Sequence, residues 1–197
     1  MSNSQTWRAK RTDFMHRVHA RLTSRGKLPT GFTSQPEPRS MGIYARGRQL
    51  TAGNFLFAGE LTESPNGSIW DIEATTAMAV DELQGFGWLD DLAAVGDFKA
   101  RDRAQTWVSE WIERYGNGIG PGWVPDLTGR RLIRWINHAL FLIRGRDQVW
   151  TDKFYRSLAH QTLFLSRRGK TIKPGLARFE AMAGMIYAGL ALQGMAK

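Results

Sequence analysis

The sequence predicts an all-α fold built from stacked antiparallel αα-hairpins. Apolar residues recur at three- and four-residue spacing in roughly five or six segments of about 15–20 residues, the pattern of packed helices. Short turns rich in Gly and Pro separate these segments. Because helices joined by short turns are antiparallel neighbours, we expect either a solenoid or a toroid.

The composition excludes several kinds of site. The 197 residues include eight Trp and ten Phe, which predicts one domain, or one and a half, with an aromatic core. Cysteine is absent, so the chain has no disulfide, thiolate zinc site or cysteine nucleophile. The four His are scattered, and we predict neither a metal site nor a cofactor. No apolar run approaches the roughly 18 residues of a membrane span, and the first residues lack the apolar core of an export signal.

The net charge of +9 is unevenly distributed along the chain. Residues 1–50 hold ten Lys and Arg against two acids, residues 51–97 hold none against nine, and residues 98–197 hold seventeen against seven. A nucleic-acid-binding protein could use either basic block. Equally, an acidic helical layer could pack beside a basic one, or a basic groove could receive an anionic polymer.

Residues 1–46 are expected to form a basic amino-terminal helix and an extended linker. In residues 3–25, Phe14, Val18 and Leu22 lie on one line of a helix, and five Arg lie around the rest. This helix either docks on the domain or acts as an arm for a membrane surface or nucleic acid. Residues 26–54 hold three Pro and five Gly, which predicts a linker that wraps the surface.

Residues 47–197 are expected to form a single helical domain. Residues 54–59 (NFLFAG) predict a strand or a buried extended segment. Helices follow from residue 74 to 95, with a bend at its glycines, and then over 98–115, 149–168 and 175–195. Four small residues of the last helix allow close helix packing: Ala177, Ala181, Gly184 and Ala188. That helix ends without a cap, so we expect the domain to continue beyond the chain end.

The centre of the chain, residues 121–145, combines the densest apolar run with a row of polar groups. We expect one helix there, capped by Asp126 or Thr128 and ended by Gly145. Four polar residues fall on one stripe of this helix: Arg130, Arg134, Asn137 and His138. Arginines near a helix start oppose the helix dipole, so something else must hold them, either the acids of residues 60–97 or an anionic sugar chain.

Several short motifs follow one another along the chain: NFLFAG at 54–59, IWD at 69–71, LQGFGWLDDL at 83–92, WVSEWIERY at 107–115, Trp123, and RLIRWIN at 131–137. In this order they resemble the amino-terminal toroid of the heparinase II/III family of polysaccharide lyases. The resemblance covers about residues 47–195. It implies an incomplete (α/α) toroid, continued by further toroid helices and a β-sandwich domain that this chain lacks.

The resemblance also implies an activity. Such lyases cleave uronic-acid polysaccharides, glycosaminoglycans or alginate, by β-elimination without a cofactor. The proton removed lies α to a carboxylate, whose charge must be neutralised by a donor such as Asn, His or Arg. A Tyr or His then takes the proton. The partner implied is an acidic polysaccharide, and the setting is the bacterial periplasm or cell envelope, with the cytoplasm as the alternative.

The candidate site residues follow from the stripe and from the resemblance. Asn137 and His138 would neutralise the substrate carboxylate; the alternative is a buried polar pair. Substrate binding is expected of five residues: Trp123, Arg130, Arg134, Trp135 and Arg178. Aromatic faces stack on sugars, although core packing is the alternative for both Trp. Arg178 is either a substrate contact or a solvated helix start.

Three functions remain open from the sequence. The first is the substrate-groove portion of a heparinase II/III-like lyase, in which this chain alone is expected to be inactive. The second is a non-catalytic relative that binds an anionic glycan, because Leu176 and Ala177 stand where many family members have an Asn-His pair. The third is a basic helical-repeat module for nucleic acid or protein, with nucleic acid the less favoured partner.

Overall fold

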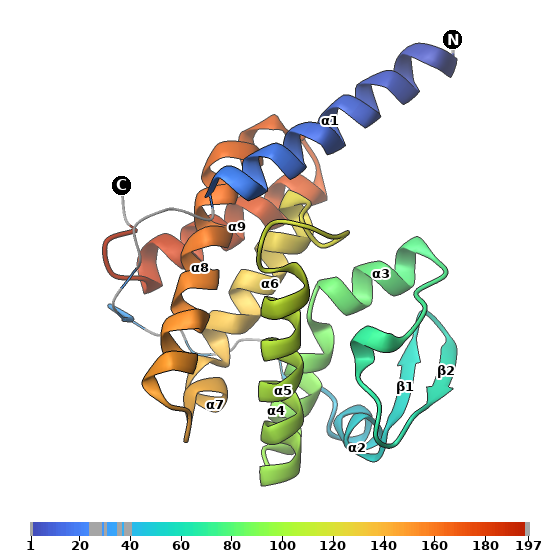
Figure 1. Ribbon diagram of the computed structural model, residues 1–197, viewed down its shortest axis with the longest axis vertical. Helices are drawn as coiled ribbons and strands as arrows, with labels where there is room; N and C mark the ends of the chain where they lie inside the picture. Colours follow the sequence, from blue (N-terminus) through green and yellow to red (C-terminus); the bar gives the residue numbers. More distant parts are fainter. Residues whose placement is uncertain (1, 24–28, 30, 35–36, 38–40, 196–197) are drawn as a thin grey trace.

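The structure is a computed structural model that describes residues 2–23, 29, 31–34, 37 and 41–195, with only the backbone described for residues 2–9. Helices account for 68% of it and strands for 6%. The predicted all-α class is therefore confirmed. Figure 1 shows the helices stacked side by side, with a small β-hairpin at one edge and α1 projecting from the opposite end.

Apart from the 22-residue α1, the first half of the chain holds short helices and the hairpin. The elements are α1 (Ser2–Thr23), α2 (Tyr44–Ala52), β1 (Asn54–Phe57), β2 (Glu60–Glu63), the 3-10 turn η1 (Ile69–Asp71), α3 (Ala77–Gln84) and α4 (Gly87–Val95). The strand expected within residues 54–59 is confirmed as β1, which pairs antiparallel with β2.

The linker predicted over residues 26–54 is wrong at its carboxyl end, where α2 lies. Its helix is held by tertiary packing: Leu50 is buried, and a Cβ on Gly47 would lie 2.2 Å from the Asp91 carbonyl oxygen of α4. Packing of this kind can stabilise a helix in a segment whose Gly- and Pro-rich composition predicts a linker. The domain boundary expected between residues 46 and 47 falls inside α2.

The second half of the chain is a run of longer helices. They are α5 (Phe98–Tyr115), α6 (Pro125–Asn137), α7 (Ala139–Ile143), α8 (Gln148–Arg168), the 3-10 turn η2 (Gly169–Thr171) and α9 (Leu176–Ala191). In the view of Figure 1, α5 and α8 run upward, α6 runs downward, and α9 lies obliquely across the stack. Helices α5, α6 and α8 thus alternate in direction, as expected of αα-hairpins.

The single helix predicted over residues 121–145 is in fact two. Helix α6 ends at Asn137, and α7 starts at Ala139 after His138, whose ψ of 19° is not helical. The predicted capping residues are also wrong. Pro125 occupies the first turn of α6, where its missing N–H costs nothing, and no side chain caps the helix.

An aromatic core forms around Phe86, the residue immediately before α4. Its φ of 62° lies in the left-handed region, which is costly for a residue with a side chain. Four indoles surround its fully buried ring with centroids 4.6–5.9 Å away: Trp70, Trp88, Trp111 and Trp135. This packing offsets the backbone strain and fixes the bend that the neighbouring glycines predicted.

Helices α6 and α9 cross at two glycines. A Cβ on Gly184 would lie 2.4 Å from the Gly129 Cα, and a Cβ on Gly129 would lie 2.3 Å from the Glu180 carbonyl oxygen. Only hydrogen atoms fit between backbones this close. The small-residue stripe predicted for the last helix therefore serves as its contact with α6.

Helix α1 packs against α8, which is the docked alternative for the basic amino-terminal helix. Two histidines lie in this contact. The Arg168 Nε of α8 donates to His16 Nδ1 of α1 at 3.1 Å. On α8, the ring of His160 faces the Ala20 carbonyl of α1 with Nε2 and the Gly116 carbonyl with Nδ1, and the neutral ring donates to one of the two at a time. The carboxyl end of α1 is thus fixed to both α8 and the loop after α5.

We expect acidification to weaken the docking of α1. Burial, with Arg168 alongside, lowers the pKa of His16 to about 4, and burial also lowers the pKa of His160. Since a freely exposed His titrates near pH 6.5, the stabilisation by His16 is complete above about pH 6.5 and is lost as the pH falls towards 4. Native-state hydrogen exchange should show protection factors in α1 falling over this range while those in α5 persist.

The variant His16→Gln provides the control for this pH dependence. Glutamine does not titrate, so the loss of α1 protection on acidification should become shallower. An unchanged pH profile in this variant would show that His16 does not set the stability of the docked helix.

Candidate functional site

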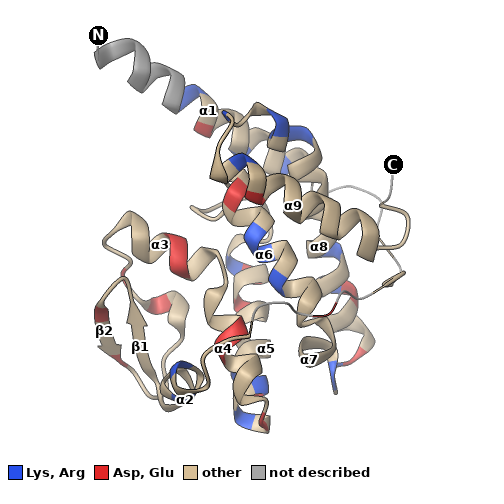
Figure 2. Cartoon of the chain, turned by 180° about the vertical axis from the view of Figure 1, so that it is seen from behind, with Lys and Arg blue, Asp and Glu red and all other residues tan. Residues whose placement is uncertain are grey.

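An open pocket of about 440 Å³ lies where α6 faces α2, α3 and α4. We call it the α6 pocket. Seven of its fifteen lining residues are charged: Arg46, Asp81, Glu82, Asp90, Asp91, Arg130 and Arg134. Figure 2 shows acidic residues on α3 and α4 and basic residues on the facing helix α6. The acidic middle of the sequence and the polar stripe of the central helix therefore meet here.

Arg130 lies among three carboxylates. Its Nη2 is 2.8 Å from Asp81 Oδ2 and 3.7 Å from Asp126 Oδ2, and its Nε is 3.6 Å from Glu180 Oε2. One cation thus faces three anions from α3, α6 and α9. Two partners are expected for the arginines at the helix start, the acids of residues 60–97 or an anionic sugar chain. In the structure Arg130 pairs with an acid of that segment, Asp81.

Asp90 of α4 binds two further residues of the polar stripe, Arg134 and His138. The Arg134 Nε donates to Asp90 Oδ2 at 2.8 Å, and its Nη1 donates to the Gly85 carbonyl at 2.7 Å. The other oxygen, Asp90 Oδ1, lies 2.8 Å from His138 Nε2. Both oxygens of this buried carboxylate are therefore in use, and they join α4 to the last turn of α6 and to the break residue His138.

Asn137 and His138 are both buried, which agrees with the polar-pair alternative for them. His138 is bound to Asp90, so a substrate carboxylate would have to displace this contact before the imidazole could neutralise it. Neither residue lines the α6 pocket. Their role in carboxylate neutralisation stays a prediction.

Trp123 and Trp135 belong to the core, contrary to the expectation that they bind substrate. Trp123 is 2% exposed, and its indole N–H donates to the Tyr115 carbonyl at 2.7 Å. Trp135 is fully buried and stacks on Phe154 with ring centroids 5.4 Å apart. Because neither ring offers a face to solvent, sugar stacking on them would require the core to open.

Arg178 lies elsewhere. It occupies the first turn of α9, is partly exposed and does not line the α6 pocket. The structure thus brings Arg130 and Arg134 into the lining of one pocket and leaves Arg178 outside that lining.

Arg131 does not line the pocket as Arg130 and Arg134 do, because its side chain is fully buried. Its Nε donates to Gln161 Oε1 at 2.7 Å, and its Nη1 donates to the carbonyls of Gln84 and Gly122 at 3.1 and 3.2 Å. The guanidinium carbon lies 4.1 Å from the centre of the Trp111 ring. Among the described residues no carboxylate pairs with it, and burial lowers its pKa to about 9, which leaves it charged at neutral pH.

Sequence reasoning missed Arg46 and Asp91. Asp91 Oδ1 accepts the Ile43 N–H at 2.7 Å, and Oδ2 lies 3.5 Å from Arg46 Nε. Burial raises the pKa of Asp91, against the opposing effects of the Ile43 N–H and Arg46. The signal in the sequence was the pair Asp90-Asp91 inside an otherwise apolar helix, since buried acids need partners.

In the described part of the chain, no three His, Asp or Glu side chains are grouped so that they could hold a metal ion. None of the helices described is both long enough and apolar enough to cross a membrane.

Part of the sequence is similar to a known protein. The chain is 30% identical over 106 residues to FtsZ-localized protein C of Caulobacter vibrioides (strain NA1000 / CB15N). The match covers 53% of this chain and 18% of that protein, so the chain spans less than a fifth of its relative. No family model matches the sequence, and no solved structure matches the fold. The incomplete toroid and the lyase family therefore stay predictions.

Proposed function

We propose that this chain is the helical, glycan-binding portion of a protein built like the heparinase II/III polysaccharide lyases. The α6 pocket carries the proposal: it is open, and it combines arginines with carboxylates. Guanidinium groups donate to sugar oxygens and carboxylates accept from sugar hydroxyls, so such a lining suits a polar, hydroxyl-rich ligand. The all-α fold and the motifs that resemble the lyase toroid support the same reading.

Cleavage by this chain alone is not part of the proposal. β-Elimination requires a group that takes the α-proton, and neither Tyr nor His occurs among the described residues that line the pocket. The neutralising candidates Arg134 and His138 are both bound to Asp90. The glycan-binding alternative therefore fits this geometry better than a complete lyase site, and elimination is proposed only for a longer protein that adds the missing groups.

The test combines equilibrium binding with an ultraviolet assay for unsaturated uronate. Heparan, alginate, hyaluronan and chondroitin are each titrated into the chain and then incubated with it. We expect binding to at least one polymer and no rise in absorbance. Absence of binding to all four, or displacement by double-stranded DNA at equal charge and with the same salt slope, would contradict glycan recognition.

The relative supports a second candidate function of a different class. The name of FtsZ-localized protein C places that protein with FtsZ, so we propose as an alternative that the present chain binds FtsZ or a protein associated with it. Co-sedimentation with FtsZ polymers separates the two. Retention on polymers, with no affinity for any glycan, would favour the protein partner over the proposal above.

A further inference from the structure

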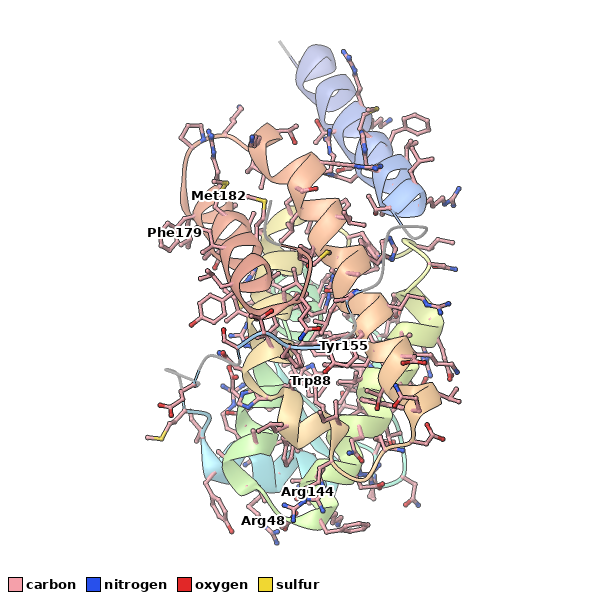
Figure 3. All side chains as sticks on the ribbon, turned by 90° about the vertical axis from the view of Figure 1, so that its left-hand side faces the viewer. Arg48, Trp88, Arg144, Tyr155, Phe179 and Met182 are labelled. Atoms are coloured by element: carbon pink, nitrogen blue, oxygen red, sulfur yellow. The ribbon has the colours of Figure 1, made fainter. Side chains whose placement is uncertain are left out.

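Helix α9 has two apolar faces of different kinds. The face towards α6 consists of small buried residues, among them Ala181, Gly184 and Ala188. Figure 3 shows Phe179 pointing away from the helix stack, whereas Trp88 of α4 lies inside it. Because the small residues already fix α9 on α6, the contact between these helices does not need the large side chains on the outer face. These are exposed at 73, 72, 55 and 64%, in the order Leu176, Phe179, Ile186 and Leu190.

The exposed residues of α9 follow the spacing of a coiled-coil seam. With Ala183 included, successive members are three, four, three and four residues apart, as the a and d positions of a heptad are. Such a stripe remains on one side of the helix and pairs with a second helix laid along it. It extends over about 21 Å of helix axis. We call it the α9 seam, and its members are Leu176, Phe179, Ala183, Ile186 and Leu190.

A groove of about 640 Å³ between α8 and α9 borders the α9 seam. Ile186 and Leu190 belong both to the seam and to the groove. Among the described residues that line the groove none is charged, and α8 contributes Leu163 to it. A hollow of this kind admits the side chains of a helix laid along the seam, the arrangement of an amphipathic helix in an apolar groove. The flat surface of a lipid bilayer matches it less well.

The hairpin that carries the α9 seam is strongly basic. Residues 153–197 hold eight Lys and Arg against one acid, Glu180. Its Oε2 lies 3.6 Å from Arg130 Nε of α6, so this carboxylate is engaged on the side of α6. Two copies of so basic a face repel each other, whereas acidic residues on a partner are attracted. The end of α8, the turn after it and the first turn of α9 supply cations that are at least partly exposed: Arg167, Lys170, Lys173 and Arg178.

We propose that the α9 seam and the groove beside it bind an amphipathic helix of a partner protein, whose apolar stripe is flanked by acidic residues. Large side chains of the partner enter the groove, and its Asp and Glu side chains lie against the cations around the α8–α9 turn. This docking surface is independent of the proposed glycan binding, because the α6 pocket and the groove share none of their described lining residues.

Designed peptides test the proposal. Each has three heptads with Leu at a and d, and carries either Glu or Lys at e and g. Like charges repel between neighbouring peptides, so each is largely unfolded by itself. Fluorescence anisotropy of the labelled peptides measures their affinity for the chain. We expect the Glu peptide to bind about tenfold more tightly than the Lys peptide and to gain helix content in circular dichroism when it binds.

Two variants with matched controls assign the binding to the α9 seam. Phe179→Ala should weaken binding of the Glu peptide about tenfold, because the partner loses an apolar contact. Phe98→Ala is its control on α5, where Phe98 is 75% exposed, and should have no effect. Lys170→Glu should weaken binding of the Glu peptide several-fold, whereas Lys99→Glu makes the same change on the exposed surface of α5 and should leave the affinity unchanged.

The other occupants of the α9 seam give different results. No binding of the Glu peptide, or unchanged binding in Phe179→Ala, would overturn the proposal, and equal affinity for both peptides would contradict an acidic partner. A dimer in sedimentation that Phe179→Ala abolishes would show that a second copy covers the seam. Binding to anionic phospholipid vesicles that the same variant abolishes, without binding of the Glu peptide, would assign the seam to a membrane surface. Glycan binding is measured separately by the polymer titrations.

Discussion

Replacement of Arg131 by alanine is expected to lower the free energy of unfolding by about 4 kcal/mol, as large core truncations do. The side chain is fully buried and donates to Gln161 and to the carbonyls of Gln84 and Gly122. Its removal leaves these acceptors without a donor and opens a cavity beside Trp111. Urea unfolding followed by Trp fluorescence measures the change through the midpoint at constant slope.

The substitution also removes a charge that is buried away from water, and this effect by itself would raise the stability. Replacing a buried ion by an apolar group can be neutral when its partners are replaced as well, but here three acceptors remain. Loss of donors therefore outweighs the relief. Arg156→Ala provides the matched control, because Arg156 is exposed on α8 and its loss should cost less than about 0.5 kcal/mol. A stability of Arg131→Ala equal to that of the control would refute the structural role of this buried arginine.

Gly184→Val is expected to destabilise the protein by about 3 kcal/mol or more, the upper range for overpacking. The added Cβ would lie 2.4 Å from Gly129 Cα and 2.6 Å from the Gly129 carbonyl oxygen. Both atoms belong to the backbone of α6, which cannot move aside as a flexible side chain would. Thermal and urea unfolding should therefore shift together, and α6 and α9 should separate or tilt.

Gly189→Ala is the control on the same helix. A Cβ on Gly189 meets no atom within 4 Å, so the substitution should stabilise α9 by about 0.5–1 kcal/mol, through helix propensity alone. Opposite signs at two glycines five residues apart would establish that the α6–α9 crossing, and not glycine content, sets the stability of α9. Destabilisation by both changes to the same degree would contradict this.

The sequence predicts the helical part of this fold well where the pattern is long and regular. Residues 98–115 carry apolar side chains at three- and four-residue spacing, and α5 has these bounds. The small residues of the last helix likewise predict a close helix–helix contact, although they do not predict that the partner is α6. Periodicity and residue size act locally, so they can be read from the chain alone.

The errors have a common cause in contacts between distant segments. The composition of residues 44–52 predicts a linker, whereas α2 forms there through packing against α4. The apolar spacing of residues 121–145 predicts one continuous helix, whereas the break at His138 is held by Asp90, 48 residues earlier in the chain. Contacts between segments this far apart in the sequence cannot be inferred from the spacing of apolar residues within one segment.

At the candidate site, the residue types can be predicted from the sequence, which has an acidic segment without Lys or Arg and an arginine stripe on one face of a helix. Helical spacing alone places Arg130 and Arg134 on one side. Their pairing with Asp81 and Asp90, and the burial of the intervening Arg131 in the aromatic core, are seen in the three-dimensional structure alone. The reason is that charge pairing and burial depend on which helices meet, and the meeting of α3, α4 and α6 is set by the whole core.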